Sequence, residues 1–381
     1  MNLNPFRKRI PRPVLAVVLI VTIIVGYSWV RAITSPGQES FAARNAEWMR
    51  DHHLGSVVDR VEQYQYSHDQ PPDGGTPDQA LIGPTPAPSA PTTGPIPQGA
   101  VPQPMRSPAA TPFPNEGQWT PAGPLAADGT AGVYVTRVRP NPLKTSLVVF
   151  VARVDPSRTR VQLVAGTELP GGTWSHPPQI TADECSSAIL AFNGGFRFDQ
   201  SAGGWYSDGR EAAGLPLQDG AASLVTFADG SVTVGTWGRD VTRADLPKVR
   251  SVRQNLTLLV DGGAVVPTID DGPKWGARLK NSLFVWRSGY GVSATGELLY
   301  VGGPGLTPRD LAERLIDAGA VRGMQGDINP EWVAANLIHA DAGGCHGTPG
   351  LNGPADQGGQ RSSGDRYLST DTRDFVEILS R

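Results

Sequence analysis

Asparagine and glycine end an apolar run in the middle of the chain, at Asn193, Gly194 and Gly195 (SAILAFNGGF). The apolar run predicts a buried strand. The two glycines tolerate positive φ and leave room for a ligand against the backbone, while Asn193 offers an amide that could orient a polar substrate. The pattern is equally typical of an ordinary turn. The segment is therefore a candidate substrate-binding loop with a plain structural alternative.

Arg287 follows another apolar run and precedes small residues (FVWRSGYGVSATG). The planar guanidinium forms paired hydrogen bonds with phosphate and carboxylate groups. Arg287 could therefore bind an anionic part of a substrate, or it could form a structural ion pair.

Oxygen-bearing side chains are closely spaced in the segment GMQGDINPEW. Asp327 ends an expected strand, and Asn329 and Glu331 follow within four residues. Such a group could hold a divalent cation, or its two carboxylates could share acid–base catalysis. Alternatively, Asp327 caps a helix that starts near Pro330, which the local pattern favours. The pattern requires no cofactor, and whether the site needs a metal stays open.

A glycine-rich, polar segment at residues 341–365 is too long for a tight turn. It predicts either a mobile flap over a site or a disordered surface insertion.

The elements that must position these residues are mostly strands. Three hairpins are predicted by turn signals between alternating runs, at Asp229-Gly230, at Asp261-Gly262-Gly263 and at Thr295-Gly296. Two further strands precede them (SLVVFVARVD and RTRVQLVAG), and RDFVEIL predicts a closing strand.

One helix stands out, over residues 308–318. Thr307 is its expected N-cap, Pro308 its first residue and Asp310 the partner in a capping box, while Gly319 ends it. A strand-rich chain with few helices predicts an α+β class, with a single domain of mixed or antiparallel sheet and hairpins.

The N-terminal third is organised differently. Residues 1–13 form a basic tail, and residues 14–30 are a continuous apolar run that predicts a transmembrane signal anchor with its N-terminus in the cytoplasm. A cleaved signal peptide is the competing interpretation. Residues 35–68 predict a stalk of two short helices. Residues 69–118 predict a disordered spacer, because 16 of the 35 prolines lie between Pro71 and Pro124. Residues 119–381 form the extracytoplasmic domain.

Composition excludes several protein classes. The formal net charge of −3, with no basic stripe beyond the N-terminal tail, argues against nucleic acid as a partner. The sequence carries no nucleophile-elbow, P-loop, zinc-protease or dinucleotide fingerprint. Cys185 and Cys345 lie outside the cytoplasm by this topology and are expected to form a disulfide.

The order of the motifs resembles the phosphodiester glycosidase family. AFNGGF is followed by the hairpins, by RSGYGVSATGELLYV, by GLTPRDLAERLIDAGA, by a strand that ends in Asp327 and by a closing RDF. In this resemblance Asn193 and Gly194 match the family's N-G-G-F loop. Arg287 matches the arginine of its R-[ST]-A-x-G motif, and Asp327 matches the aspartate of L-D-G-G-G-S.

The resemblance implies cleavage of the glycosidic bond of a phosphodiester-linked sugar in a cell-envelope or extracellular polysaccharide. Asp327, Glu331 and Arg287 are the expected catalytic residues. Asn193, Gly194, Gly195 and Asn329 are the expected substrate-binding residues. This chain departs from the family at GDINPEW, where the glycines and serine after the aspartate are missing, and at RSG, where the family usually has alanine. Two alternatives therefore stay open: a surface module that binds glycans without turnover, and a glycosidase acting on unphosphorylated glycans.

Overall fold

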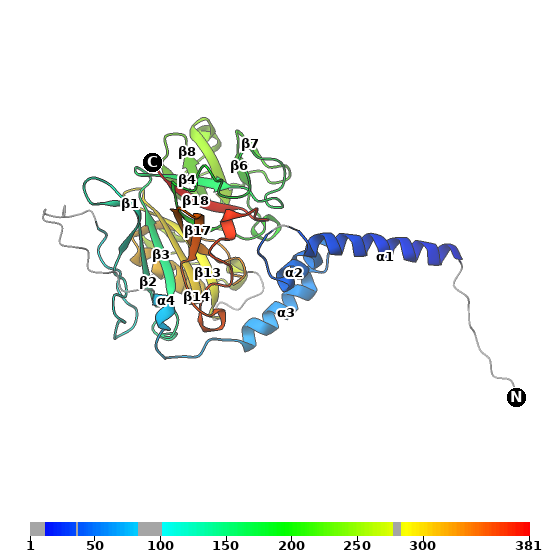
Figure 1. The fold of residues 1–381 in the computed structure, drawn as a ribbon, viewed down its shortest axis with the longest axis horizontal. Helices are drawn as coiled ribbons and strands as arrows, with labels where there is room; N and C mark the ends of the chain where they lie inside the picture. The colour runs from blue at the N-terminus through cyan, green and yellow to red at the C-terminus, as the bar shows by residue number, and fades with distance from the viewer. Residues whose placement is uncertain (1–11, 36, 83–100, 277–282) are drawn as a thin grey trace.

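Antiparallel strands form the body of the molecule (Figure 1). The structure is a computed structural model that describes residues 12–35, 37–82, 101–276 and 283–381. Every pairing between the named strands is antiparallel. The strands belong to three sheets, and the predicted strand-rich α+β class is confirmed.

The first sheet has eight strands in the order β1-β2-β3-β14-β13-β15-β11-β12. Their bounds are β1 Thr120–Leu125, β2 Ala131–Val138, β3 Val149–Val154, β11 Leu258–Asp261, β12 Ala264–Val265, β13 Val285–Ser293, β14 Leu298–Leu306 and β15 Ala320–Gln325.

The two other sheets have five strands each. The second has the order β17-β16-β5-β18-β4, with β4 Thr159–Val164, β5 Ala188–Asn193, β16 Ala335–Asp341, β17 Gly344–Pro349 and β18 Phe375–Ser380. The third has the order β7-β6-β10-β8-β9, with β6 Trp205–Ser207, β7 Arg210–Glu211, β8 Ala222–Phe227, β9 Val232–Thr236 and β10 Val249–Gln254.

The helices lie outside the sheets, and all of them except α1 are short. They are α1 Arg12–Ile33, α2 Phe41–Asp51, α3 Gly55–His68, α4 Gln79–Ile82, α5 Phe198–Ser201 and α6 Pro308–Asp317. Four 3-10 turns add η1 Arg243–Lys248, η2 Gly272–Trp275, η3 Ala355–Gln357 and η4 Arg366–Leu368. The three predicted hairpins and the predicted final strand are all present.

The main apolar core lies between the three sheets and is built from alternate residues of their strands. In β13, Tyr290 and Val292 belong to this core, whereas Gly289 and Gly291, which alternate with them, face helix α6. A Cβ on Gly289 or Gly291 would come within 3.2 to 3.4 Å of the leucines of α6. The glycines of RSGYG therefore let α6 pack closely on the sheet.

Helix α6 begins at Pro308 with the predicted N-terminal cap and ends at Asp317, one residue before the predicted end. The Thr307 side chain accepts a hydrogen bond from the Asp310 amide, and the Asp310 carboxylate accepts one from the Thr307 amide, which completes the capping box. Its buried leucines form a second core against the outer face of the first sheet.

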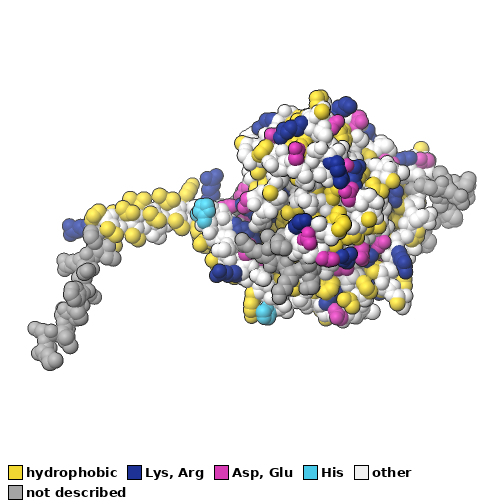
Figure 2. Space-filling model, turned by 180° about the vertical axis from the view of Figure 1, so that it is seen from behind, with side chains coloured by type: hydrophobic (Ala, Val, Ile, Leu, Met, Phe, Trp, Pro, Cys, Tyr) yellow, Lys and Arg dark blue, Asp and Glu magenta, His cyan; other side chains and the backbone are white. Residues whose placement is uncertain are grey.

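Helix α1 projects from the body, and its side chains form a continuous apolar rod (Figure 2). It is 22 residues long, none of them buried, and the mean hydropathy of its most apolar 18 residues is 2.4. Among the described residues it is the one helix long and apolar enough to cross a membrane.

Parts of the proline-rich stretch pack against the domain. Leu81 of α4 and Phe113 are buried in the main core, and Met105 is buried in the second core. Only residues 83–100 of the predicted spacer lie outside the described residues. The average composition of the stretch predicts disorder because it does not register these few apolar side chains. Each of them stabilises the packed arrangement by removing apolar surface from water.

The disulfide prediction is confirmed. Cys185 and Cys345 are bonded, with their Cα atoms 5.6 Å apart. The bond joins the segment before β5 to β17, at one edge of the second sheet.

Candidate functional site

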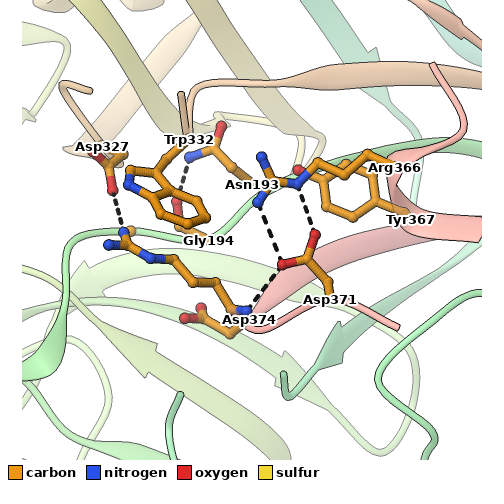
Figure 3. A pocket seen from close by; sticks show the side chains of 10 residues that line it. Asn193, Gly194, Asp327, Trp332, Arg366, Tyr367, Asp371 and Asp374 are labelled. Atoms are coloured by element: carbon orange, nitrogen blue, oxygen red, sulfur yellow. Dashed lines mark hydrogen bonds and ion pairs between the residues drawn. The ribbon is translucent and has the colours of Figure 1, made fainter. Parts of the chain in front are cut away.

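A polar cavity of about 10 Å³, room for a single water molecule, lies just beyond the ends of β5 and β15 and just before the start of β18 (Figure 3). Its lining is Asn193, Gly194, Gly195, Asp327, Trp332, Arg366, Tyr367, Asp371, Arg373 and Asp374. Asn193, Gly194, Gly195 and Asp327 of the sequence prediction therefore come together here. A larger cavity of about 350 Å³ shares Asp327, Trp332 and Arg373 with it and extends to helix α3.

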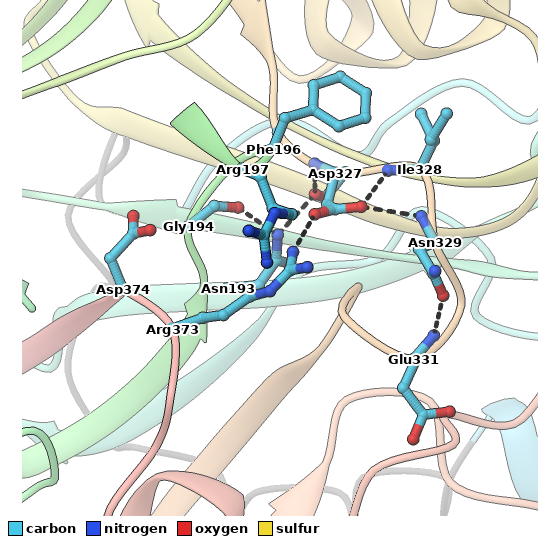
Figure 4. Close-up of polar contacts among 12 residues, drawn as sticks. Asn193, Gly194, Phe196, Arg197, Asp327, Ile328, Asn329, Glu331, Arg373 and Asp374 are labelled. Atoms are coloured by element: carbon cyan, nitrogen blue, oxygen red, sulfur yellow. Dashed lines mark hydrogen bonds and ion pairs between the residues drawn. The ribbon is translucent and has the colours of Figure 1, made fainter. Parts of the chain in front are cut away.

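Asp327 is the central carboxylate and is 3% exposed. Its Oδ1 accepts hydrogen bonds from the amides of Ile328 (2.7 Å) and Asn329 (2.9 Å), and its Oδ2 lies 3.1 Å from the guanidinium of Arg373 (Figure 4). Burial raises the pKa of Asp327, and Arg373 opposes that rise. The amides close a turn on Asp327, and the helix expected to start near Pro330 does not form.

Two tyrosines of the main core donate hydrogen bonds to the loop at Asn193. Tyr290 donates its hydroxyl to the Gly194 carbonyl (2.7 Å), and Tyr300 donates to the Asn193 side-chain oxygen (2.9 Å). The Asn193 amide nitrogen donates to the Ser288 hydroxyl at 2.9 Å. The Asn193 side chain thus connects β5 with β13 and β14.

Both positions of this loop require glycine, because neighbouring side chains leave no room for a Cβ atom. A Cβ on Gly194 would lie 2.0 Å from the Asp374 carboxylate, and one on Gly195 would lie 2.8 Å from the Arg253 guanidinium. Asp374 and Arg253 form an ion pair of 3.0 Å, with both side chains 2% exposed or less. The glycines therefore let the loop lie directly over a buried ion pair.

Arg366, Asp371 and Arg373 complete the charged lining. Arg366 is buried and lies 2.7 Å from Asp371. The indole of Trp332 contacts both arginines, with the Arg373 guanidinium 3.7 Å from its ring centroid and that of Arg366 5.0 Å away. These cation–π contacts fix the guanidinium planes beside Asp327.

Glu331 and Asn329 do not join Asp327 as a ligand set. Figure 4 shows the Glu331 side chain directed away from Asp327. Its Oε1 accepts the backbone amide of Ser40 at 2.6 Å, and the Asn329 side-chain oxygen accepts the amide of Glu331 at 2.9 Å. The Asp327 oxygens face amides and a guanidinium, which is an arrangement for stabilising a carboxylate without a metal.

Arg287 lies on the other face of β13 and does not line the cavity. Its guanidinium donates to the carbonyls of Leu306 (3.0 Å) and Trp275 (3.1 Å) and to the side chain of Gln325 (2.9 Å). Burial lowers its pKa to about 9. The structure thus separates Arg287 from Asp327, although the adjacent Ser288 donates its amide to the Asp327 carbonyl.

Helix α2 covers the cavity from outside. Its Glu47 carboxylate lies 2.9 Å from Arg373 and also pairs with Arg197. Burial alone would raise the pKa of Glu47, but Arg373, Arg197 and Arg50 together lower it to about 2. The stalk, residues 35–68, is therefore docked on the domain through the Glu47 carboxylate, which binds the same guanidinium of Arg373 that pairs with Asp327.

Sequence reasoning missed Arg373, Asp371, Asp374 and Arg366. The signal was present as four charged residues within nine positions (RYLSTDTRD) directly before the closing strand. Only the packing of β18 beside β5 brings them to Asn193. The segment 341–365 instead supplies β17, which pairs with β16, and a packed loop in which Gln360 donates to Asn336 of β16 at 2.6 Å.

No protein-family model matches the sequence, and no curated protein matches it either. Several solved structures are similar. The zebrafish N-acetylglucosamine-1-phosphodiester alpha-N-acetylglucosaminidase catalytic domain, auto-inhibited by pro-peptide, is 13% identical with a TM-score of 0.42, over 68% of this chain and 87% of that one.

Two bacterial structures are also similar. A hypothetical protein from Synechocystis is 11% identical with a TM-score of 0.35, over 66% of this chain and 63% of that one. A protein of Burkholderia pseudomallei K96243 described as exported is 11% identical with a TM-score of 0.33, over 63% and 75%. These values describe a distant likeness, so the functional argument rests on the site itself.

Proposed function

We propose that this chain is a membrane-anchored extracytoplasmic glycan hydrolase that cleaves the glycosidic bond of a phosphodiester-linked sugar. The observation that carries the proposal is the buried Asp327 carboxylate beside Arg373, both of which line the cavity of about 350 Å³. Glycosidic cleavage builds positive charge on the sugar and negative charge on the leaving group. The aspartate can stabilise the positive charge on the sugar, and the neighbouring arginine can stabilise the negative charge on the leaving group.

In this proposal Asp327 stabilises the oxocarbenium-like sugar or transfers a proton, and Arg373 binds the phosphate. A phosphodiester is a good leaving group, so one carboxylate suffices for acid–base assistance. We assign the phosphate to Arg373 because it lines the cavity beside Asp327, whereas Arg287 lies on the other face of β13 and donates to carbonyl and amide oxygens there. Asn193 and the glycines shape the floor of the cavity, and residues 12–33 anchor the chain with the domain outside the cytoplasm.

The test is sugar release by the full chain in detergent micelles. Sugar-1-phosphodiesters are compared with glycosides of the same sugars that lack phosphate. Asp327→Asn is expected to lower kcat by about a hundredfold or more, as loss of an acid–base group does. Arg373→Ala is expected to raise KM for the phosphodiester.

Matched controls are Asp219→Asn and Arg250→Ala, two exposed side chains outside the cavity. Both should keep wild-type turnover. Glycan binding without product would instead assign a silent binding module. Faster release from unphosphorylated glycosides would assign a glycosidase for ordinary linkages.

A further inference from the structure

A second polar cluster lies on the second sheet, apart from the cavity at Asp327. It consists of His176, Glu184 and Glu377, whose ligand-type atoms all lie within 4.8 Å of one another. Glu184 and His176 belong to the segment that precedes β5, and Glu377 is in the middle of β18. Segments almost two hundred residues apart in sequence thus meet at one point.

Glu377 is the unexpected member of the cluster. Its side chain is 0% exposed and shares a strand face with Phe375 and Leu379, which are both in an apolar core. Neither carboxylate oxygen has a hydrogen-bond partner among the described residues. A buried carboxylate normally receives hydrogen bonds or a cation, because burial in apolar surroundings disfavours its charge. Either a proton or a bound cation must therefore offset the charge of this carboxylate.

The ring of His176 is oriented as a metal ligand. Its Nδ1 lies 2.7 Å from the Pro177 carbonyl, which can only accept, so Nδ1 carries a proton. A histidine that binds a metal through one nitrogen commonly donates the other N–H to a backbone carbonyl. Nε2 is then the nitrogen directed at the cluster, 3.0 Å from Glu184 Oε2.

Glu184 is held in place by its own neighbours. Its Oε2 accepts hydrogen bonds from the Thr181 hydroxyl (2.7 Å) and amide (3.1 Å), and Arg160 lies 3.3 Å from its Oε1. These contacts orient the carboxylate toward His176. Such outer partners fix the ligands around a bound metal.

We propose that His176, Glu184 and Glu377 bind a divalent metal ion of the zinc class. One imidazole and two carboxylates suit zinc, whereas calcium and magnesium prefer ligand sets made of oxygen alone. Three protein ligands leave a fourth position for water. The ion would tie the segment before β5 to β18, beside Cys185, which follows Glu184 directly. The site lies on the sheet that carries Asp374 and Asn193 toward the cavity.

The experiment uses the untagged full chain in detergent micelles, stripped with EDTA and dialysed. Zinc chloride is titrated by calorimetry, and thermal unfolding is followed with and without zinc. The stripped protein is expected to bind zinc, and zinc is expected to raise Tm. Glu377→Gln and His176→Ala should each bind one zinc ion fewer, or bind it about tenfold more weakly or worse, and should lose the rise in Tm.

The matched control is Glu168→Gln, which changes an exposed glutamate and should bind zinc as the wild type does. Glu377→Gln keeps the shape of the side chain, so its folding can be checked by circular dichroism. Three results would overturn the proposal. They are no zinc uptake, unchanged zinc binding in Glu377→Gln, and tighter binding of calcium than of zinc. The first two would mean that Glu377 is a protonated carboxyl and that His176 and Glu184 are a simple ion pair.

Discussion

Arg373 contacts two carboxylates at once, Asp327 of the cavity and Glu47 of helix α2. A guanidinium has enough donors for both, and the Trp332 ring fixes its plane. The charge that Arg373 presents to a ligand is therefore shared with Glu47. Any anion that reaches this arginine must compete with the Glu47 carboxylate.

Gly194→Ala tests the steric limit beside this arginine. Its Cβ would lie 2.0 Å from the Asp374 carboxylate, so either the loop or the Arg253–Asp374 ion pair must move. We expect a loss of about 1–3 kcal/mol in the free energy of unfolding, the usual range for overpacking. Urea unfolding measures it. Gly272→Ala is the control, because its Cβ meets nothing within 4 Å. Equal stability of the two variants would contradict the close packing of the loop.

At the scale of elements, the stalk helices form a docked cover. Helix α2 reaches the domain through Glu47 at Arg373 and Arg197, and through Asp51 at Arg197. Glu39, just before the helix, accepts the Thr372 hydroxyl at 2.6 Å. Acidic side chains of the stalk thus meet basic side chains around the cavity, and the cover is held mainly by charge.

Acid should loosen this cover. The pKa of Glu47 is lowered to about 2 on docking from an ordinary value of 4.5. Its contribution is therefore complete above about pH 4.5 and is lost as pH falls toward 2. The full shift corresponds to roughly 3 kcal/mol, and the docking energy is smaller because Arg50 of α2 itself supplies part of the shift. Hydrogen exchange of residues 41–51, corrected for intrinsic rates, should show the loss of protection over that interval.

Glu47→Gln should reproduce the loosening at neutral pH and should increase sugar release if the cover limits access. Glu62→Gln is the matched control, because Glu62 pairs with Arg50 inside the stalk. Equal protection of α2 in the two variants would mean that Glu47 does not hold the cover.

At the scale of the whole molecule, covalent and apolar contacts hold distant segments together. The disulfide links Cys185 to Cys345 across a separation of 160 residues. Leu81 inserts into the main core from a segment far before the first sheet strand. The disulfide acts within the domain, and Leu81 holds the segment after α3 against it.

Removing the disulfide should lower stability more than any single surface change. In the chain-entropy model, closing a loop of this length contributes up to about 5 kcal/mol. A Cys185→Ser, Cys345→Ser double variant should therefore unfold at lower urea concentration than the oxidised wild type. Dithiothreitol should shift the wild type toward the variant and leave the variant unchanged. Identical midpoints in all four conditions would show that the bond is energetically silent.

Local patterns in the sequence determine most of the secondary structure. The Asp-Gly and Thr-Gly turns, the capping box of Thr307 and Asp310, and the apolar run of α1 each act over a few residues, so neighbours in sequence are enough to predict them. The disulfide was also predictable, because only two cysteines are present. Asp327, Asn193 and the two glycines could be selected as a group because each ends or follows a strand.

Only the tertiary structure decides which charges meet. Arg287 and Ser288 are adjacent in sequence, but strand alternation sends the arginine to one face of β13 and the serine to the other. Arg373 reaches Asp327 because β18 pairs with β5, and Glu47 reaches Arg373 because the stalk folds back on the domain. The strength of an ion pair depends on the distance between its charges in the folded chain, and a local pattern of residues does not determine that distance.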